Sequence, residues 1–555
     1  MNAKKVIFIL LSSFIFQSLP AQVSRLSESY HEEASDPYLP NSHQNKKVSP
    51  AYNYRITPNI YNTSSSIVFT QQVNVNANGQ NILDDAANEP SIAINPLNKS
   101  EIVIGWRQFD NISSNFRQAG WSYSSDSGQT WTFPGVIEPG VFRSDPVLDF
   151  DNDGNIYYNS LTNSPTFMTS VFKSTNGGTS WNSGVSAQGG DKQWMTVDRS
   201  SGTGTDNIYS FWSSSYSVCN PDHFTRSTNS AASFENCTSV DGDPFWGTMT
   251  VNNNGDLLIS GLSNLLGEII CVQSSNAQTA GSTIVWNSPS IVDLDGYLVA
   301  GANVNPGGLL GQINIDVDRS GGAGNGNIYI LSPVQRTSNG DPADIMFARS
   351  TDGGINFDAP VQINDDSSFA SQWMGTMSVA PNGRIDIVWL DTKEDVTFTD
   401  SSALYYSYSI DQGVSWSTDE KISQLFNPHV GYPNQNKMGD YFHMISDNTS
   451  AHLAWANTLN GEQDVYYSRI TPQITSVNKN PVLTLNIFPN PADKLLYISG
   501  DNFEKVWLTN SLGVKMSIIY INQNTIDISN LTAGMYFVTI SNTQSEKVTK
   551  KFIKK

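Results

Sequence analysis

An eight-residue phrase recurs along this chain and limits what the chain can fold into. "SSDSGQTW" at residues 124–131 returns as "STNGGTSW" from Ser174, "STDGGINF" from Ser350 and "SIDQGVSW" from Ser409. Two degenerate copies, "STNSAASF" from Ser227 and "SSNAQTAGSTIVW" from Ser274, fall between the second and third. A phrase repeated at this spacing predicts a structural unit of about 50 to 65 residues that is built several times over.

A second phrase, a predicted hairpin, comes before each octet. Each copy is a short apolar or alternating strand, a turn of Asn, Asp and Gly, and a second strand. The copies begin at residues 91, 146, 194, 248, 313, 376 and 440, and the last, looser copy has no octet after it. Each unit therefore has four antiparallel strands, with the octet between the third and the fourth, and such units are typical of propeller blades. We predict an all-β chain with a seven-bladed β-propeller, closed by the segment 66–76 returning to the last sheet.

The octet itself is predicted to shape the fold. Its serine and its Asp or Asn bond nearby backbone groups, and its glycine supplies a turn with φ > 0. Its closing aromatic residue is then free to fold back and pack against a sheet.

The complete S-x-D-x-G-x-T-W pattern at residues 124–131 resembles the Asp-box, or BNR repeat, of bacterial sialidases and related propellers. The resemblance covers roughly residues 66–470. It implies a propeller whose boxes lie at the periphery, away from the active centre, and it keeps a six-bladed, sialidase-like ring as the alternative.

The last 72 residues differ from the rest of the chain in their sequence pattern and charge. They alternate short strands with Asn and Gly turns, which predicts a small C-terminal β-sandwich over residues 484–555. Residues 476–555 hold nine Lys, no Arg and five acidic residues, whereas the whole chain carries a formal charge of −20. Four features resemble the type A sorting domain of type IX secretion: Pro489 to Pro491, Gly513, the "DISNLTAGMY" segment and the terminal Lys cluster. This resemblance implies export by that machinery, with the protein released or attached to the outer surface.

The N-terminus reads as an export signal. Lys4 and Lys5 precede an apolar run that is too short for a membrane span, so we predict a signal peptide over residues 1–22 and no transmembrane segment. A loose leader (23–65), the propeller (66–472) and a linker (473–483) follow. Export permits a bond between Cys219 and Cys237, although two free thiols are an equal alternative, and Cys271 is predicted to lie in the core.

Charge and spacing exclude several classes of partner. An acidic chain without a basic stripe does not suit nucleic acid. "DFDNDG" (149–154) begins like a calcium loop, but Ser160 stands where a bidentate Glu is required. No cofactor or metal is therefore predicted.

Candidate binding residues cluster in the loops that enter each first strand and leave each second strand, on the face opposite the octets. Aromatic rings stack on sugar faces and carboxylates bond their hydroxyls, which favours a glycan or glycoprotein ligand. The residues are Arg107, Arg143, Asp145, Trp194, Trp246, Trp373 and Asp391. The alternative, that these tryptophans plug the channel as structural residues and bind no sugar, has equal support from the sequence. Arg199 and Arg319 fall in turns on the octet face and are left out of the site.

Catalysis has weaker support in the sequence. Sialidases use three arginines, a Tyr–Glu pair and an Asp; "YRITP" (54–58) resembles their first arginine motif with an extra Thr. Tyr441 as nucleophile and Asp110 as acid would complete such a site. Another glycoside hydrolase would need two carboxylates, for which Asp191, Asp243 and Asp440 are the candidates. Three hypotheses follow: a glycan-binding propeller in which cleavage is an open question, an exo-sialidase or other glycoside hydrolase, and a non-catalytic adhesin-like propeller that binds protein.

Overall fold

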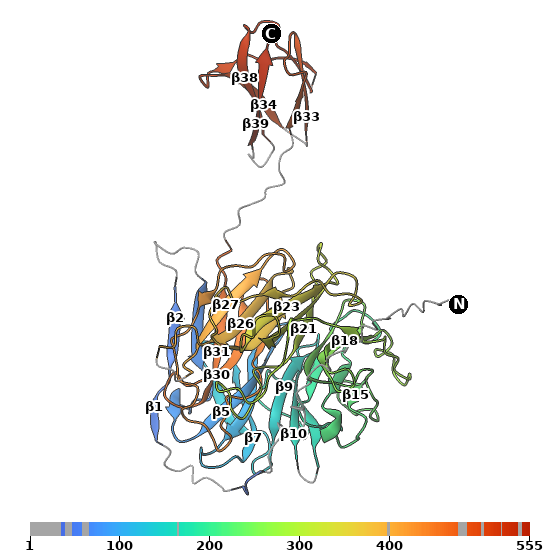
Figure 1. The fold of residues 1–555 in the computed structure, drawn as a ribbon, viewed down its shortest axis with the longest axis vertical. Helices are drawn as coiled ribbons and strands as arrows, with labels where there is room; N and C mark the ends of the chain where they lie inside the picture. Colours follow the sequence, from blue (N-terminus) through green and yellow to red (C-terminus); the bar gives the residue numbers. More distant parts are fainter. Residues whose placement is uncertain are drawn as a thin grey trace, which may run out of the picture. The chain divides into compact units, whose positions relative to one another are not determined.

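The computed structural model describes residues 35–38, 47–57, 66–163, 166–396, 400–474, 485–500, 504–522, 524–541 and 547–555. The predicted signal peptide and most of the predicted linker lie outside these ranges. The chain divides into two compact units, residues 1–473 and 474–555, which we describe separately. Both are built from β-strands, as predicted, and the described residues contain no α-helix (Figure 1).

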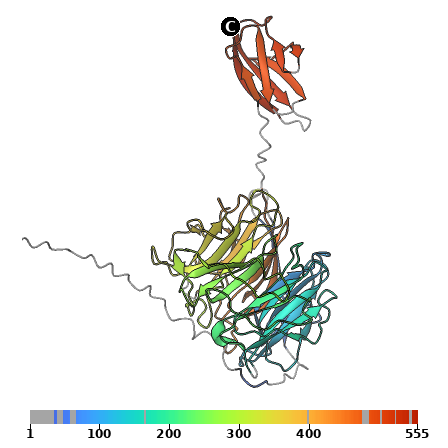
Figure 2. The ribbon, with the colours of Figure 1, turned by 90° about the vertical axis from the view of Figure 1, so that its right-hand side faces the viewer.

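Among the described residues of the first unit, seven antiparallel sheets follow one another along the chain, and we number them blades 1 to 7. The innermost strands are β5 (Ala86–Ile94), β9 (Ser144–Phe150), β13 (Trp194–Val197), β16 (Pro244–Val251), β21 (Asn314–Val317), β25 (Gln372–Val379) and β29 (His443–Ser446). Each of these strands contacts the next, and β29 contacts β5, so the sheets form a closed circle around a channel (Figures 1 and 2).

The remaining strands follow outward in sequence order. The second strands are β6 (Ile102–Phe109), β10 (Ile156–Thr162), β14 (Ile208–Phe211), β17 (Leu257–Ser263), β22 (Ile328–Arg336), β26 (Ile385–Asp391) and β30 (Ala451–Asn457). The third strands are β7 (Arg117–Ser124), β11 (Met168–Ser174), β15 (Phe224–Ser227), β18 (Ile269–Ser274), β23 (Asp344–Ser350), β27 (Ala403–Ser409) and β31 (Asp464–Thr471). The outer strands are β8 (Thr132–Val136), β12 (Val185–Ser186), β19 (Ser290–Ile291), β24 (Val361–Gln362) and β28 (Glu420–Lys421).

Blade 7 joins the two ends of the propeller. Its outer strand is β3 (Ile67–Gln72), which pairs with β31 over its whole length and so links the start of the propeller to its last sheet. In the part of the leader that the structure describes, β2 (Asn53–Ile56) adds a fifth strand beside β3, and β1 (Val48–Pro50) pairs with β4 (Gln80–Ile82). These leader segments are therefore ordered, unlike the loose segment predicted from their polar composition.

Side chains join neighbouring blades at the channel. An inner strand is the edge of its sheet, so the backbone N–H groups on its free side need another partner. At six of the seven junctions a side chain of one blade accepts an N–H from the next blade, at 2.7 to 3.3 Å. The acceptor and donor pairs are Ser91 with Leu148, Asp149 with Val197, Thr248 with Ile315, Asp316 with Val379, Ser378 with Ser446, and His443 with Ile92. We call these contacts the inter-blade bonds.

The octets fasten blades farther from the channel. In the first octet, Ser124 accepts the N–H of Gly128 at 2.9 Å, and Asp126 accepts the N–H of Thr130 at 2.9 Å. Trp131 then packs against Tyr467 of blade 7, with ring centroids 5.5 Å apart. Trp181 and Trp416 make the equivalent contacts with Trp121 of blade 1 and Phe347 of blade 5. The aromatic residue therefore packs against the preceding blade, and the octet has a structural role.

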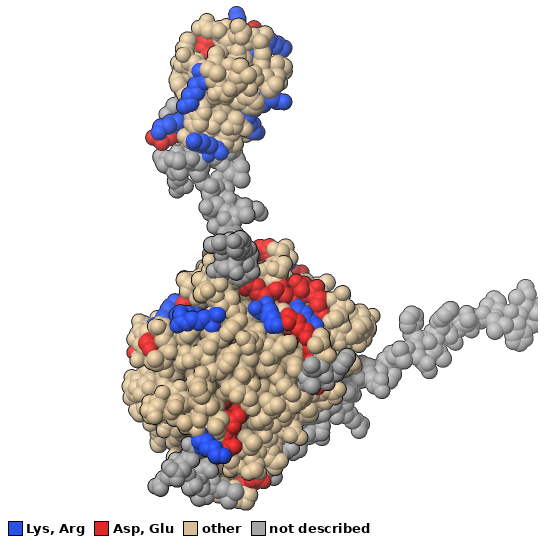
Figure 3. Space-filling view, turned by 90° about the vertical axis from the view of Figure 1, so that its left-hand side faces the viewer, with Lys and Arg blue, Asp and Glu red and all other residues tan. Residues whose placement is uncertain are grey.

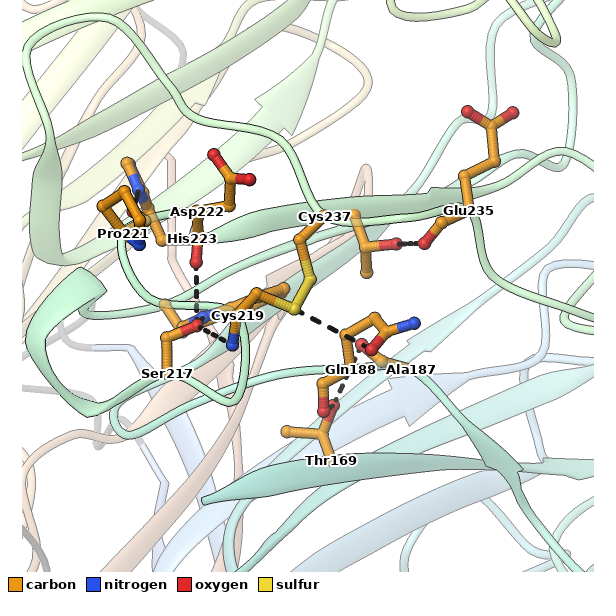
Figure 4. Close-up of a disulfide and its surroundings, with 12 residues drawn as sticks. Thr169, Ala187, Gln188, Ser217, Cys219, Pro221, Asp222, His223, Glu235 and Cys237 are labelled. Carbon is orange, nitrogen blue, oxygen red and sulfur yellow. Dashed lines mark hydrogen bonds between the residues drawn. A yellow bond between two sulfur atoms is a disulfide. The ribbon is translucent and has the colours of Figure 1, made fainter. Parts of the chain in front are cut away.

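One disulfide ties blade 3 together. Cys219 and Cys237 are bonded, which settles the alternative that the sequence left open. Figure 4 shows Cys219 on the loop after β14 and Cys237 on the segment after β15, with Gln188 of blade 2 beside the bond. Residues 235–238 pair irregularly with β15 at the place where other blades have a fourth strand. Cys271 is a buried core residue, as predicted.

The second unit is a sandwich of two four-stranded sheets. One sheet holds β32 (Leu485–Phe488), β33 (Leu495–Gly500), β37 (Thr525–Asp527) and β36 (Ile519–Asn522). The other holds β35 (Lys515–Met516), β34 (Lys505–Asn510), β38 (Gly534–Ser541) and β39 (Lys547–Lys554). Leu496, Leu508, Val538 and Phe552 are buried between the two sheets.

Substitutions at two glycines of the octets would separate the energetic cost of backbone strain from the cost of overpacking. Gly128 has φ +80°, and a Cβ placed there would lie 2.2 Å from the ring of Tyr467, whereas Gly353 has φ +77° and open space. We expect Gly353→Ala to lower the free energy of unfolding by about 1 kcal/mol, the cost of a left-handed non-glycine residue. Gly128→Ala should cost about 3 kcal/mol, because overpacking adds to that strain. Denaturant unfolding followed by tryptophan fluorescence measures both, and equal costs would contradict the fastening role.

Candidate functional site

The central channel has two different ends, and both bear on function. One end is formed by the segments that enter the inner strands, where the sequence places its candidate site. The other is formed by the last residues of the inner strands and by the hairpin turns, on the octet face. The first end is closed by a buried network of charges, and the second holds a cavity.

The closed end carries four acidic and four basic side chains in one network. Its members are Glu89, Asp145, Asp191, Asp440, Arg107, Arg117, Lys192 and Lys437, and all are buried. Lys192 and Lys437 contact Asp440 at 2.7 and 2.8 Å. Arg107 and Lys437 contact Glu89 at 3.1 and 3.3 Å. With equal numbers of each sign, these charges compensate one another, which burial requires.

Burial and neighbouring charges shift the pKa values of the network in opposite directions. Burial raises the pKa of Asp191 to about 6, although Lys192 opposes the shift. For Asp440, burial is outweighed by Lys192 and Lys437, which hold the pKa well below its usual range. Glu89, Asp145 and Lys192 also adopt φ values of +48°, +46° and +57°, where non-glycine residues are strained. The tightly paired surroundings maintain these conformations.

A long connection covers this end of the channel. It links β20 (Gly296–Tyr297), which pairs with β22, to β21. Leu309 donates its N–H to Asp440 at 2.9 Å, and Asn305 donates its amide to the carbonyl of Gly439 at 2.7 Å. Both residues are fully buried. The connection between blades 4 and 5 therefore reaches blade 7 and seals the network from solvent.

The structure brings together only part of the predicted site. Asp191, Asp440, Asp145 and Arg107 meet in the network. Tyr441 lies beside it, donating its hydroxyl to the carbonyl of Pro146 at 2.8 Å, and burial raises its pKa well above the usual value. A neutral, buried phenol and carboxylates held by cations are not arranged as nucleophile and acid.

The other predicted residues lie apart from the network. Asp243 accepts a hydrogen bond from Ser214 at 3.0 Å, and Arg143 pairs with Glu138. Asp391 accepts a hydrogen bond from Gln372 at 3.2 Å. Asp110, the predicted acid, accepts a hydrogen bond from Gln118 at the outer side of blade 1.

The three tryptophans pack inside the protein. Trp194, Trp246 and Trp373 are 6%, 3% and 0% exposed, so none offers an open ring face to a sugar. Trp246 packs on Phe245, and Trp373 donates to Ser402. Trp194 alone borders the channel cavity.

The open end of the channel holds a cavity of about 340 Å³. Its wall includes the penultimate residues of six inner strands: Asp149, Thr196, Thr250, Asp316, Ser378 and Ile445. Four methionines, Met195, Met249, Met377 and Met444, also line it. The guanidinium side chains of Arg199 and Arg319 border the cavity and remain 32% and 29% exposed, so solvent reaches it.

The two arginines come from one tetrapeptide. "VDRS" occurs at Val197–Ser200 and again at Val317–Ser320, at the first turn of blades 3 and 5. Arg199 pairs with Asp149, and Arg319 pairs with Asp316 at 2.9 Å. Both arginines lie on the octet face, where the sequence placed them, and their side chains border the channel cavity. The repeated tetrapeptide was the signal that could have identified them.

His443 completes the wall of the cavity as a neutral donor. Its Nδ1 accepts the N–H of Ile92 at 3.3 Å and lies 2.8 Å from the hydroxyl oxygen of Ser91, so in the neutral ring Nε2 carries the proton. Burial lowers the pKa of His443 to about 4. Among the described residues, no group of three or more His, Cys, Asp or Glu side chains is placed to hold a metal ion. The "DFDNDG" loop is a turn in which Asp151 accepts the N–H groups of Asp153 and Asn155.

Comparison with known proteins identifies the second unit. Residues 486–555 match the family of secretion system C-terminal sorting domains. This match confirms the predicted sorting domain and implies export to the cell surface or beyond. In the part of the chain that the structure describes, no helix is long and apolar enough to span a membrane.

The propeller has structural relatives at low sequence identity. A protein of unknown function from Dyadobacter fermentans is 15% identical, with 73% of this chain and 98% of that chain covered and a TM-score of 0.42. A polysaccharide lyase described as an ulvan lyase is 10% identical, with 70% and 94% covered and a TM-score of 0.43. A Trypanosoma rangeli sialidase is 12% identical, with 75% and 59% covered and a TM-score of 0.35. No curated protein sequence matches the chain. Identities this low say nothing about activity.

Removing one charge from the closed end tests its structural role. Lys192→Met leaves Asp440 with one cation and the network with a net negative charge, so we expect a loss of about 3–5 kcal/mol in the free energy of unfolding. The double variant Lys192→Met/Asp440→Asn restores neutrality and should regain part of that loss. Lys421→Met removes a cation from a pair with Glu394 at the surface and should cost under about 1 kcal/mol. Equal losses for Lys192→Met and Lys421→Met would contradict the buried network.

Proposed function

We propose that this chain is an exported propeller that binds a glycan or glycoprotein outside the cell, with the channel cavity as its binding site. The observation that carries the proposal is the cavity itself, which solvent reaches and which residues of six blades line, arginine, threonine, serine, histidine and methionine among them. A cavity of about 300 Å³ or more with a few fixed polar groups is the usual form of a small-ligand site. Hydroxyl groups and apolar patches together suit a sugar ring.

The same geometry favours binding over cleavage. The carboxylates considered for catalysis, Asp191 and Asp440, lie in the sealed network, and Asp243 is held by Ser214. The two carboxylates of the cavity, Asp149 and Asp316, accept backbone N–H groups of the next blade and pair with arginines. None of these carboxylates faces a second, free carboxylate across an open space, as glycoside hydrolysis requires.

In this proposal the C-terminal sorting domain directs the export of the protein. The type IX machinery recognises residues 484–555, and the propeller is then released or held at the outer surface. On the face that Figure 3 shows, most of the described surface is uncharged, with one larger group of acidic side chains and smaller groups of both signs. This agrees with a chain that has only 15% charged residues.

A glycan array followed by titration calorimetry tests the binding site. We expect the wild-type propeller to bind at least one glycan, and Arg199→Ala/Arg319→Ala to weaken that binding at least tenfold, because two guanidinium donors leave the cavity wall. Arg349→Ala is the matched control, since Arg349 pairs with Asp358 away from the cavity. A fluorogenic sialoside should not be turned over. If the double variant still binds the glycan with wild-type affinity, the cavity is not the binding site. If the wild-type protein cleaves the sialoside and Tyr441→Phe abolishes that cleavage, the sialidase hypothesis is favoured.

A further inference from the structure

We propose that the channel cavity selects an uncharged sugar residue and rejects sugars that carry a carboxylate, such as uronates and sialic acids. This inference rests on the proposed function, because it names the ligand class of the same cavity. The observation that supports this inference is that both arginines of the cavity, Arg199 and Arg319, are already paired with aspartates of the protein.

Each guanidinium already has an anion in place. Arg199 donates to Asp149 and packs over the ring of Phe150, 4.4 Å from its centroid. Arg319 donates to Asp316 at 2.9 Å and to the carbonyls of Val251 and Val317 at 2.8 and 3.2 Å. The charges of both arginines are therefore compensated within the protein, and what remains for a ligand is hydrogen-bond donation.

The two aspartates cannot turn away to make room for a carboxylate on the ligand. Asp149 accepts the N–H of Val197 at 2.7 Å, and Asp316 accepts the N–H of Val379 at 2.8 Å. These are inter-blade bonds, so displacing either aspartate leaves a backbone donor of the next blade unpaired at the channel. An anionic ligand would therefore meet two fixed carboxylates without gaining a free cation.

The rest of the wall adds no charge. His443 is neutral, and its Nδ1 is held by the N–H of Ile92 and the hydroxyl of Ser91. Thr196 donates to Asp149, Thr250 accepts from Arg319, and Asn314 donates to the carbonyls of Gln312 and Gly375, so these polar groups are uncharged and fixed in place. The four methionines supply an adaptable apolar surface. A hydroxyl-rich, uncharged ring with one apolar face matches both kinds of lining.

Matched pairs of sugars test the inference. The probes are the methyl glycosides of glucose, galactose and mannose and the corresponding uronates, which differ only at C6. We expect at least one neutral glycoside to bind wild-type protein at least tenfold more tightly than its uronate. Because the cavity has no net charge, this binding should be nearly unchanged between about 50 mM and 500 mM NaCl.

Asp149→Asn and Asp316→Asn should shift the selectivity toward uronates. Each variant keeps the side-chain oxygen that accepts the backbone N–H, but leaves its arginine uncompensated. We expect the ratio of uronate to neutral affinity to rise at least tenfold in each. Asp358→Asn, which frees Arg349 outside the cavity, should leave the ratio unchanged.

The outcomes separate the two proposals. If none of the six probes binds and the glycan array is also silent, the proposed function fails. If uronates bind wild-type protein as tightly as neutral glycosides, or the binding of a neutral glycoside weakens strongly with salt, the selectivity fails while the proposed function stands. Because the wild-type measurements decide this point, the inference remains testable even if an Asn variant does not fold.

Discussion

The free edge of each inner strand is the constraint on which this propeller depends. Seven sheets placed around a channel present seven such edges, and every backbone N–H on them must find an acceptor. At six junctions the acceptor is a Ser, Thr, Asp or His side chain of the preceding blade, and His443 closes the circle by accepting from Ile92 of blade 1. The need to close the ring therefore decides which polar residues face the channel, before any ligand is considered.

The same constraint explains why the two ends of the channel differ. Where the inner strands begin, four acidic and four basic side chains are buried beneath the long connection before β21, so opposite charges must lie close together. Where the inner strands end, the hairpin turns border the cavity, and the arginines of the two "VDRS" turns remain partly exposed. Opposite charges are thus paired at both ends of the channel. Only the open end, which holds the cavity, leaves space and hydrogen-bond donors for another molecule.

Local patterns predicted the architecture well because the repeats carry their own turn chemistry. The octets, the hairpins and the alternating strands of the tail predicted an all-β propeller followed by a sandwich, and both are observed. The site was harder to predict, because it depends on contacts across the ring. Nothing near residues 299–310 in the sequence indicates that this connection reaches Gly439 and closes one mouth. Likewise Glu89, Lys192 and Lys437 belong to no motif, and their role depends on three different blades meeting.

The junction between blades 3 and 4 is the one that lacks an inter-blade bond among the described residues, and it lies beside the cavity. Trp194 occupies the strand position that Ser91, Thr248 and His443 occupy in other blades, three residues before the last residue of the inner strand. An indole has a donor and no acceptor, so Trp194 cannot form the inter-blade bond of its neighbours. Its ring instead meets Tyr441 and His443 edge to face, with centroids 5.3 and 5.5 Å away. One large side chain in place of a small acceptor thus fills the channel between the charged network and the cavity.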